Sequence, residues 1–221
     1  MKTSQNLTIA LHLLLASLPM LLEMAWQPHP DIVLGVRARD FSSWPYIFTA
    51  PFAHGGPAHL FANLSGLWIL GAGLLHFYPR RGVWLFWLLP FLSTIPVWLW
   101  ARPAVHLGAS GWVFGLIGLL LVGGLRRRNR RGLALAGAVL VLYGGTLAGI
   151  FPTEPYISWE SHLSGLLLGA LLGWLWLEVP PETRMDASGK APETGYQRGF
   201  QPIAFGNFRY TSSEPSQDEK S

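Results

Sequence analysis

Long runs of apolar residues, separated by short polar or proline-containing segments, dominate the chain up to about residue 179. Runs of this length predict helices rather than strands, and about 20 residues at 1.5 Å per residue cross the ~30 Å hydrocarbon core of a bilayer. Six such runs predict membrane-spanning helices over residues 7–24, 58–78, 83–101, 110–125, 133–151 and 162–179. The expected fold is therefore an all-α, polytopic membrane protein with a six-transmembrane-helix bundle.

Two of these runs depart from a regular span. Pro90 and Pro96 are expected to bend or break the third helix, because each removes a backbone donor. The fourth run, 110–125, is short for a bilayer crossing. Its far end is fixed by the arginine-rich residues 126–131, so the end at Ser110 is expected to stop below the membrane surface.

The composition is typical of a membrane protein, and it excludes several kinds of catalytic and metal site. The chain is 50% hydrophobic and only 13% charged, against ~25% charged in typical soluble domains. It contains no cysteine, which excludes disulfides, a thiolate nucleophile and thiolate metal ligands. The net charge of +4 follows from arginines in the loops and is not expected to mark a nucleic-acid partner.

The distribution of lysine and arginine predicts the orientation. With six spans, Lys2, the Arg80–Arg81 pair, the arginines of residues 126–131 and the basic residues after 180 all fall on one side. The positive-inside rule places that side in the cytoplasm, so both termini are expected there, in the plasma (inner) membrane. Ser110 and the aromatic-rich first loop, residues 27–57, then lie towards the outer face.

The division of the chain follows its composition. Residues 1–179 form the expected helical core, and residues 180–221, rich in Pro, Glu, Ser, Thr and Gly, read as a disordered cytoplasmic tail.

One serine stands where a loop turns into a helix. Ser110 lies between Gly108 and Gly111, at the start of the fourth predicted helix. The first-turn amides of a helix have no intrahelical partner, and the helix dipole brings partial positive charge to them. These features suit a nucleophile whose reaction passes through an oxyanion.

Three further polar residues are expected at the same depth. His59 and Asn63 are four residues apart on the second helix, and His162 begins the sixth. Polar and ionisable groups within a membrane are functional candidates. We interpret Ser110 as nucleophile, His162 as general base, and His59 with Asn63 as oxyanion donors. No carboxylate is placed to complete a triad, which favours a Ser–His dyad.

Small residues predict that the fourth and sixth helices touch. Gly111 and Gly115 on one helix and Gly165 and Gly169 on the other allow two backbones to approach closely. This contact would bring His162 to Ser110. Phe114, one turn after the serine, is then expected to pack its ring against the imidazole.

Other functions explain less of the pattern. A metal site at His54, His59 and His162 lacks a fourth ligand and leaves Ser110 unexplained. A solute transporter should carry polar residues through the other half of the membrane as well. His106 and His54 lie near the candidate site without a defined role.

Taken together, the residues His59-x-x-x-Asn63, Gly108-Ala109-Ser110-Gly111 and His162-x-x-Gly165-x-x-x-Gly169 resemble those of a rhomboid intramembrane serine protease. The resemblance covers about residues 7–179. It implies a rhomboid-like bundle with a Ser110–His162 dyad and no cofactor or metal. The oxyanion donors are expected at His59, Asn63, Ser110 and Gly108. The implied partners are the lipid bilayer and transmembrane protein substrates, cleaved near the outer end of a span.

Two positions differ from that family's common pattern. Trp44 is followed by Pro45 where Trp-Arg is common, which leaves the anchoring of the first loop open, and Phe114 replaces a common Tyr. A rhombosortase-like subgroup, which trims C-terminal sorting tails, remains an alternative, as does a catalytically inactive relative that binds or escorts membrane proteins.

Overall fold

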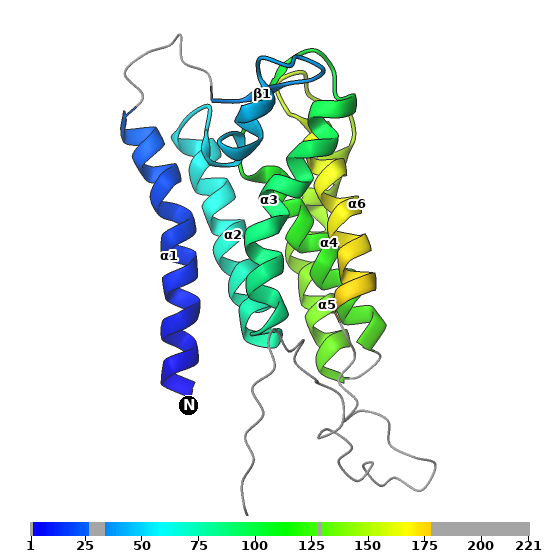
Figure 1. Ribbon diagram of the computed structural model, residues 1–221. Helices are drawn as coiled ribbons and strands as arrows, with labels where there is room; N and C mark the ends of the chain where they lie inside the picture. Colours follow the sequence, from blue (N-terminus) through cyan, green and yellow to red (C-terminus); the bar gives the residue numbers. More distant parts are fainter. Residues whose placement is uncertain (1, 27–33, 128–129, 178–221) are drawn as a thin grey trace, which may run out of the picture. The chain divides into compact units, whose positions relative to one another are not determined.

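Helices make up most of the chain in the computed structural model, which describes residues 2–26, 34–127 and 130–177 (Figure 1). Their bounds are α1 Lys2–Trp26, α2 Pro57–Phe77, α3 Arg81–Trp100, α4 Ser110–Arg127, α5 Arg130–Tyr143 and α6 Trp159–Trp176. Four of them, α1 to α4, are long and apolar enough to cross a membrane by length and composition. The protein is thus a helical membrane protein. The expected tail, residues 180–221, lies outside the described residues.

The first loop is anchored to the end of α3. It holds the short strand β1 (Val36–Arg37), paired antiparallel with β2 (Val105–His106), and the 3-10 helices η1 (Trp44–Phe48) and η2 (Ala50–Phe52). Its inner side chains, with two from α3 and the turn after it, form a separate small core: Val36, Ala38, Ile47, Ala50, Val97 and Ala101. The Arg39 backbone N–H also donates to the Trp98 carbonyl at 2.8 Å.

Helix α4 is the centre of the helical core, since its side chains from Ser110 to Leu120 are buried. Its glycines lie against those of α6, backbone to backbone. A Cβ added at Gly165 or Gly169 would overlap the carbonyl oxygen of Gly111 or Gly115, far inside van der Waals contact. In Figure 1 the two helices run side by side over their length. The expected contact between the fourth and sixth helices is present.

Of the expected bend or break in the third helix, a break does not occur, because α3 continues through Pro90 and Pro96. Membrane helices tolerate proline where nearby groups satisfy the freed backbone polar atoms. Ser93 Oγ and Thr94 Oγ1 donate back to the Pro90 carbonyl at 3.0 and 2.8 Å, whereas the carbonyl that Pro90 leaves without a helical donor is that of Phe86, four residues earlier.

The fifth helix is shorter than expected. α5 ends at Tyr143, and the chain continues as the 3-10 helix η3 (Gly145–Ile150) instead of an α-helix to residue 151. Gly144 and Gly145 stand at the change, and glycine weakens a helix by ~1 kcal/mol relative to alanine. The sixth helix begins three residues earlier than predicted, at Trp159, which places His162 in its first turn.

Candidate functional site

A cavity of about 870 Å³ lies between α2, α4 and the start of α6. Its lining includes the four polar residues singled out in the sequence: His59, Asn63, Ser110 and His162. They come from three helices, and the contact between α4 and α6 brings two of those helices together. The structure therefore gathers the predicted site residues around one space.

Gly108 shapes the turn before Ser110. Its φ of +109° is favourable only for glycine, and an added Cβ would lie 2.6 Å from His59 Cε1 and 3.5 Å from Asn63 Nδ2. The glycine thus lets both side chains approach the backbone beside the serine. Its own N–H, however, donates to the Ala50 carbonyl at 2.8 Å. The expectation that Gly108 serves as an oxyanion donor is therefore corrected to a steric role.

Two donors beside Ser110 have no partner in the described part of the chain. The Ser110 amide, at the start of α4, makes no hydrogen bond there. The Asn63 side chain is 6% exposed, and its Nδ2 is buried without an acceptor. An unsatisfied buried donor costs about 1–3 kcal/mol. Both groups are thus available to an oxygen atom that a bound molecule brings.

His162 is held on two sides. The Phe114 ring stacks on the imidazole with the ring centres 4.1 Å apart and the planes 5° from parallel. The Nδ1 atom lies 2.8 Å from the Gly149 carbonyl oxygen in η3. Because a carbonyl only accepts, Nδ1 carries the proton, which leaves Nε2 as the basic nitrogen. The Gly149 backbone carbonyl thus orients the His162 ring, as a carboxylate does in a catalytic triad.

Ser110 and His162 share the cavity without a hydrogen bond between their side chains in the described structure. Such bonds are often long in a site without substrate and tighten when one binds. The backbone contact of Gly111 with Gly165 fixes how far apart the two helices can be.

His54, in the loop before α2, supports the turn that carries the serine. Its Nδ1 donates to the Phe52 carbonyl at 3.1 Å, and its Nε2 lies 3.4 Å from the Ala109 backbone N–H, which donates to it. The imidazole can accept that bond only when neutral. Burial of the ring, together with Coulombic repulsion from the neighbouring imidazole of His59, lowers the pKa of His54 to about 4, so His54 is neutral at physiological pH.

This histidine predicts a pH dependence of stability. Between pH 6.5, the ordinary pKa, and about 4, the unfolded chain takes up a proton on His54 that the folded chain does not. The contribution of neutral His54 to the free energy of unfolding is therefore fully present above pH 6.5, and it is lost progressively as the pH is lowered towards 4. We expect the thermal midpoint of the wild type to drop more between pH 7.5 and 5 than that of His54→Gln. Equal drops would contradict this role.

His106 connects the turn before the serine to the start of α6. Its Nε2 donates to the Arg102 carbonyl at 3.0 Å, and its Nδ1 lies 2.6 Å from Ser158 Oγ, which is 2.6 Å from Ser161 Oγ. Beside it, Arg102 pairs with the buried Glu160 at 3.3 Å. Glu160 therefore faces Arg102, and the carboxylate does not serve as a third member behind His162.

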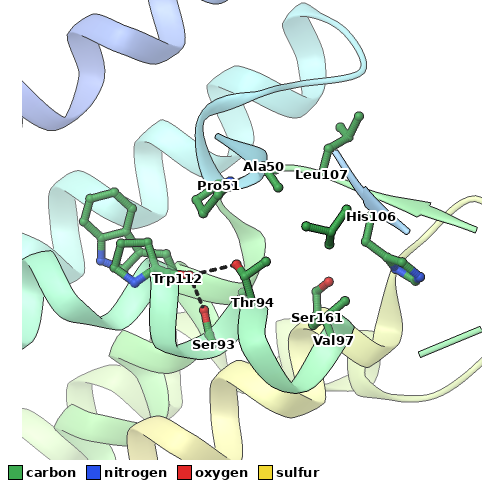
Figure 2. A pocket seen from close by; sticks show the side chains of 13 residues that line it. Ala50, Pro51, Ser93, Thr94, Val97, His106, Leu107, Trp112 and Ser161 are labelled. Atoms are coloured by element: carbon green, nitrogen blue, oxygen red, sulfur yellow. Dashed lines mark hydrogen bonds between the residues drawn. The ribbon is translucent and has the colours of Figure 1, made fainter. Parts of the chain in front are cut away.

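A much smaller cavity, about 10 Å³, lies on the other side of Gly111 (Figure 2). Ser93, Thr94 and Ser161 supply polar groups to it, and Trp112 closes one wall. Its volume is about that of one water molecule. Ser110 lines the large cavity and does not line this small one.

Sequence reasoning missed the parts played by Gly149, His54 and His106. Gly149 acts through its backbone carbonyl, which has no side-chain signature. The spacing of His54 from His59 gave a partial signal, since His54 lies in the loop before α2, His59 in its first turn, and the ring centres are 5.1 Å apart. For the metal alternative, no group of three or more His, Cys, Asp or Glu side chains that could hold an ion occurs in residues 2–26, 34–127 and 130–177.

Comparison with known proteins shows the family to which the chain belongs. Residues 42–179, more than half of the chain, match the family described as the Rhomboid domain. An uncharacterized protein of Mycobacterium tuberculosis is 36% identical over 141 residues, 60% of this chain and 58% of that protein. Rhomboid-like protein 11, chloroplastic, of Arabidopsis thaliana is 31% identical over 171 residues, 68% of this chain and 59% of that protein. The chain thus spans less than two thirds of these relatives' lengths. It belongs to the rhomboid family.

Proposed function

We propose that the protein is an intramembrane serine endopeptidase, with Ser110 as nucleophile and His162 as base. The observation that carries this proposal is the fixed imidazole of His162. With Nδ1 bonded to the Gly149 carbonyl and the ring stacked on Phe114, its basic nitrogen belongs to the cavity that Ser110 also lines. A merely structural histidine would not need a free basic nitrogen beside a serine at a helix start.

The reaction follows from these groups. Ser110 Oγ attacks the carbonyl carbon of a peptide bond while His162 Nε2 takes its proton, giving a tetrahedral oxyanion. The Ser110 amide, Asn63 Nδ2 and His59 donate to that oxyanion. Its collapse breaks the C–N bond as His162 returns the proton to the leaving amine. Water, activated by the same base, then hydrolyses the acyl-enzyme and frees Ser110. No cofactor or metal takes part.

The proposed setting is a six-span protein in the plasma membrane with both termini in the cytoplasm. Arginines at the start of α3 and at the end of α4 support this orientation under the positive-inside rule. The site then lies towards the outer face. Substrates are transmembrane segments that must unwind locally, because a helical peptide bond is hydrogen-bonded and shielded.

Cleavage of a reporter tests the proposal. The purified full chain, in detergent and in vesicles, is mixed with single-span reporters, and the products are mapped by mass spectrometry. A fluorophosphonate probe is added in parallel and its site of attachment identified. We expect a cut near the outer end of the span and a covalent adduct on Ser110. Neither a product nor an adduct, with folded protein, would favour the inactive binding or escort alternative.

The same cleavage assay distinguishes a general rhomboid protease from the rhombosortase-like alternative. Reporters that carry a short C-terminal sorting tail are compared with reporters of the same span followed by a folded domain. Cleavage restricted to the tailed reporters would support the rhombosortase-like role, and cleavage of both would support a general rhomboid protease.

The role of Asn63 makes a separate prediction. Asn63→Ala removes the buried, unpartnered Nδ2 donor. Loss of one oxyanion donor costs about 10²–10³ in kcat, and we expect that loss with KM little changed. Asn63→Ala also removes an unsatisfied buried group, so the midpoint of thermal unfolding should change little although kcat falls. A tenfold or greater rise in KM with kcat retained would show that Asn63 binds substrate instead.

A further inference from the structure

An ion pair lies between the loop that follows α3 and the first turn of α6. Arg102 Nε lies 3.3 Å from Glu160 Oε1, and the Arg102 backbone N–H donates to the same oxygen at 3.3 Å. The guanidinium also donates, through Nη2, to the Ile157 carbonyl. One residue of the loop is thus bonded at three points to residues 157–160, around the start of α6.

The carboxylate of this pair is buried, and it depends on Arg102. Glu160 is 1% exposed, whereas the Arg102 side chain is 35% exposed. Within the described residues, both polar contacts of the carboxylate come from Arg102, and its second oxygen, Oε2, has no hydrogen-bond partner. A well-packed apolar pair of similar volume is often as stable as a buried ion pair or more stable. Stability alone therefore does not explain the pair.

The pair joins the two chain segments that carry the candidate catalytic residues. Arg102 is eight residues before Ser110, on the loop that leads into α4, and Glu160 is two residues before His162 on α6. Their side chains meet although 58 residues separate them in sequence. A displacement of either segment against the other would therefore change the distance from Ser110 to His162.

The first turn of α6 needs a tie of its own. It carries His162, yet the backbone contact that Gly165 makes with Gly111 lies one turn further along the helix. Helix ends fray, and Ser158, which precedes this turn, makes no side-chain capping bond. The bonds from Arg102 hold the turn from the side of the loop that leads to the serine.

We propose that Arg102 is a positioning residue, which holds the first turn of α6, and with it His162, in register with Ser110. This role rests on the proposed function, because only a working Ser110–His162 pair gives the register a catalytic consequence. A displacement of about 1 Å can cost about 10²-fold in rate, so loss of the tie should lower kcat. Arg102 also lines the large cavity. If it bound substrate instead, its loss would raise KM.

Two variants separate the tie from the charge. Glu160→Gln removes the buried charge but keeps an oxygen that accepts the same bonds, so kcat should stay within about fivefold, since neutral hydrogen bonds are only weaker. Arg102→Met, added to Glu160→Gln, then removes the guanidinium without leaving an unpaired buried charge. In this double variant we expect kcat to fall about 10²-fold, with KM within about twofold and the thermal midpoint little changed.

Arg37→Gln is the matched control. Arg37 lies on β1, opposite Val105 of β2, and its side chain is exposed. It shares the charge of Arg102 and the same pair of strands, and its loss should leave kcat unchanged.

A distance measurement tests the positioning role without proteolysis. Because the chain contains no cysteine, spin labels can be attached to single cysteines introduced at Val105 and Leu167, which are 39% and 61% exposed. Electron spin resonance should give one narrow distance distribution for the parent and for Glu160→Gln. Adding Arg102→Met should broaden it. If the parent cleaved no reporter, the proposed function would fail while these distances still tested the tie.

Several results would overturn the positioning role. Parental kcat, or an unbroadened distance distribution, in the double variant would show that the register does not need Arg102. A tenfold or greater rise in KM with kcat retained would show that Arg102 binds substrate. The full loss of kcat already in Glu160→Gln would assign the effect to the carboxylate charge near His162, and an equal loss in Arg37→Gln would indicate a general effect of charge.

Discussion

Ser110→Ala should abolish cleavage of a transmembrane reporter, with a fall of at least about 10³-fold in kcat. The substitution removes only the hydroxyl group. In serine hydrolases without the nucleophile, the oxyanion donors retain only a small part of the rate acceleration. His162→Ala should cause a similar loss, because the two residues act as one unit and their effects do not add. Product formation is followed by gel electrophoresis, with folding checked by thermal unfolding.

Matched controls make this result specific. Ser65 lines the same cavity, and its hydroxyl is bonded to the Ala62 carbonyl at 2.8 Å, so Ser65→Ala should retain activity within about twofold. His76, at the far end of α2, provides the corresponding histidine control. Substantial cleavage by Ser110→Ala, or an equal loss in Ser65→Ala, would contradict the assignment of the nucleophile.

Gly169→Ala should destabilise the protein strongly, although it adds a single methyl group. That methyl would overlap the Gly115 carbonyl, and backbone atoms of α4 cannot move aside as a side chain can. Overpacking of this kind costs about 1–3 kcal/mol or more. We also expect reporter cleavage to fall, since separating α4 from α6 moves His162 away from Ser110. The midpoint of thermal unfolding in detergent measures the first effect.

The same substitution at Gly137 should have the opposite sign. Gly137 lies in α5, and an added Cβ would meet nothing within 4 Å. Glycine to alanine at an unstrained helical position typically stabilises by about 0.4–1 kcal/mol. A higher midpoint for Gly137→Ala beside a lower one for Gly169→Ala would show that the contact with α4 is responsible. Equal shifts would indicate a general effect of helix propensity.

The sequence predicted those features that depend on local spacing. Phe114 stacks on His162 because it lies one turn after Ser110, and the helix contact follows from glycines at intervals of three and four. The end of α5 was missed because apolar residues continue through the Gly144–Gly145 pair. Here two glycines of low helix propensity end the α-helix, although the apolar residues that follow them would by themselves predict a continuing membrane span.

Other features depend on chain folding over long distances, which spacing does not encode. The Gly149 carbonyl reaches His162 only because η3 replaces the last turns of the expected helix. The bond of the Gly108 amide to the Ala50 carbonyl joins two loops. Backbone groups of this kind carry no residue-type signal, so only a three-dimensional structure assigns them.

The pairing of α4 with α6 also means that the candidate site is completed late in synthesis. Ribosomes deliver the chain from its N-terminus, so α4 is inserted while α6, which begins about fifty residues later, is still inside the ribosome and translocon. During that interval the serine has no base beside it. Under the proposed mechanism, the Ser110–His162 pair is complete only when α6 joins the bundle. A chain truncated before Trp159 would lack His162, and under the proposed mechanism it should not cleave.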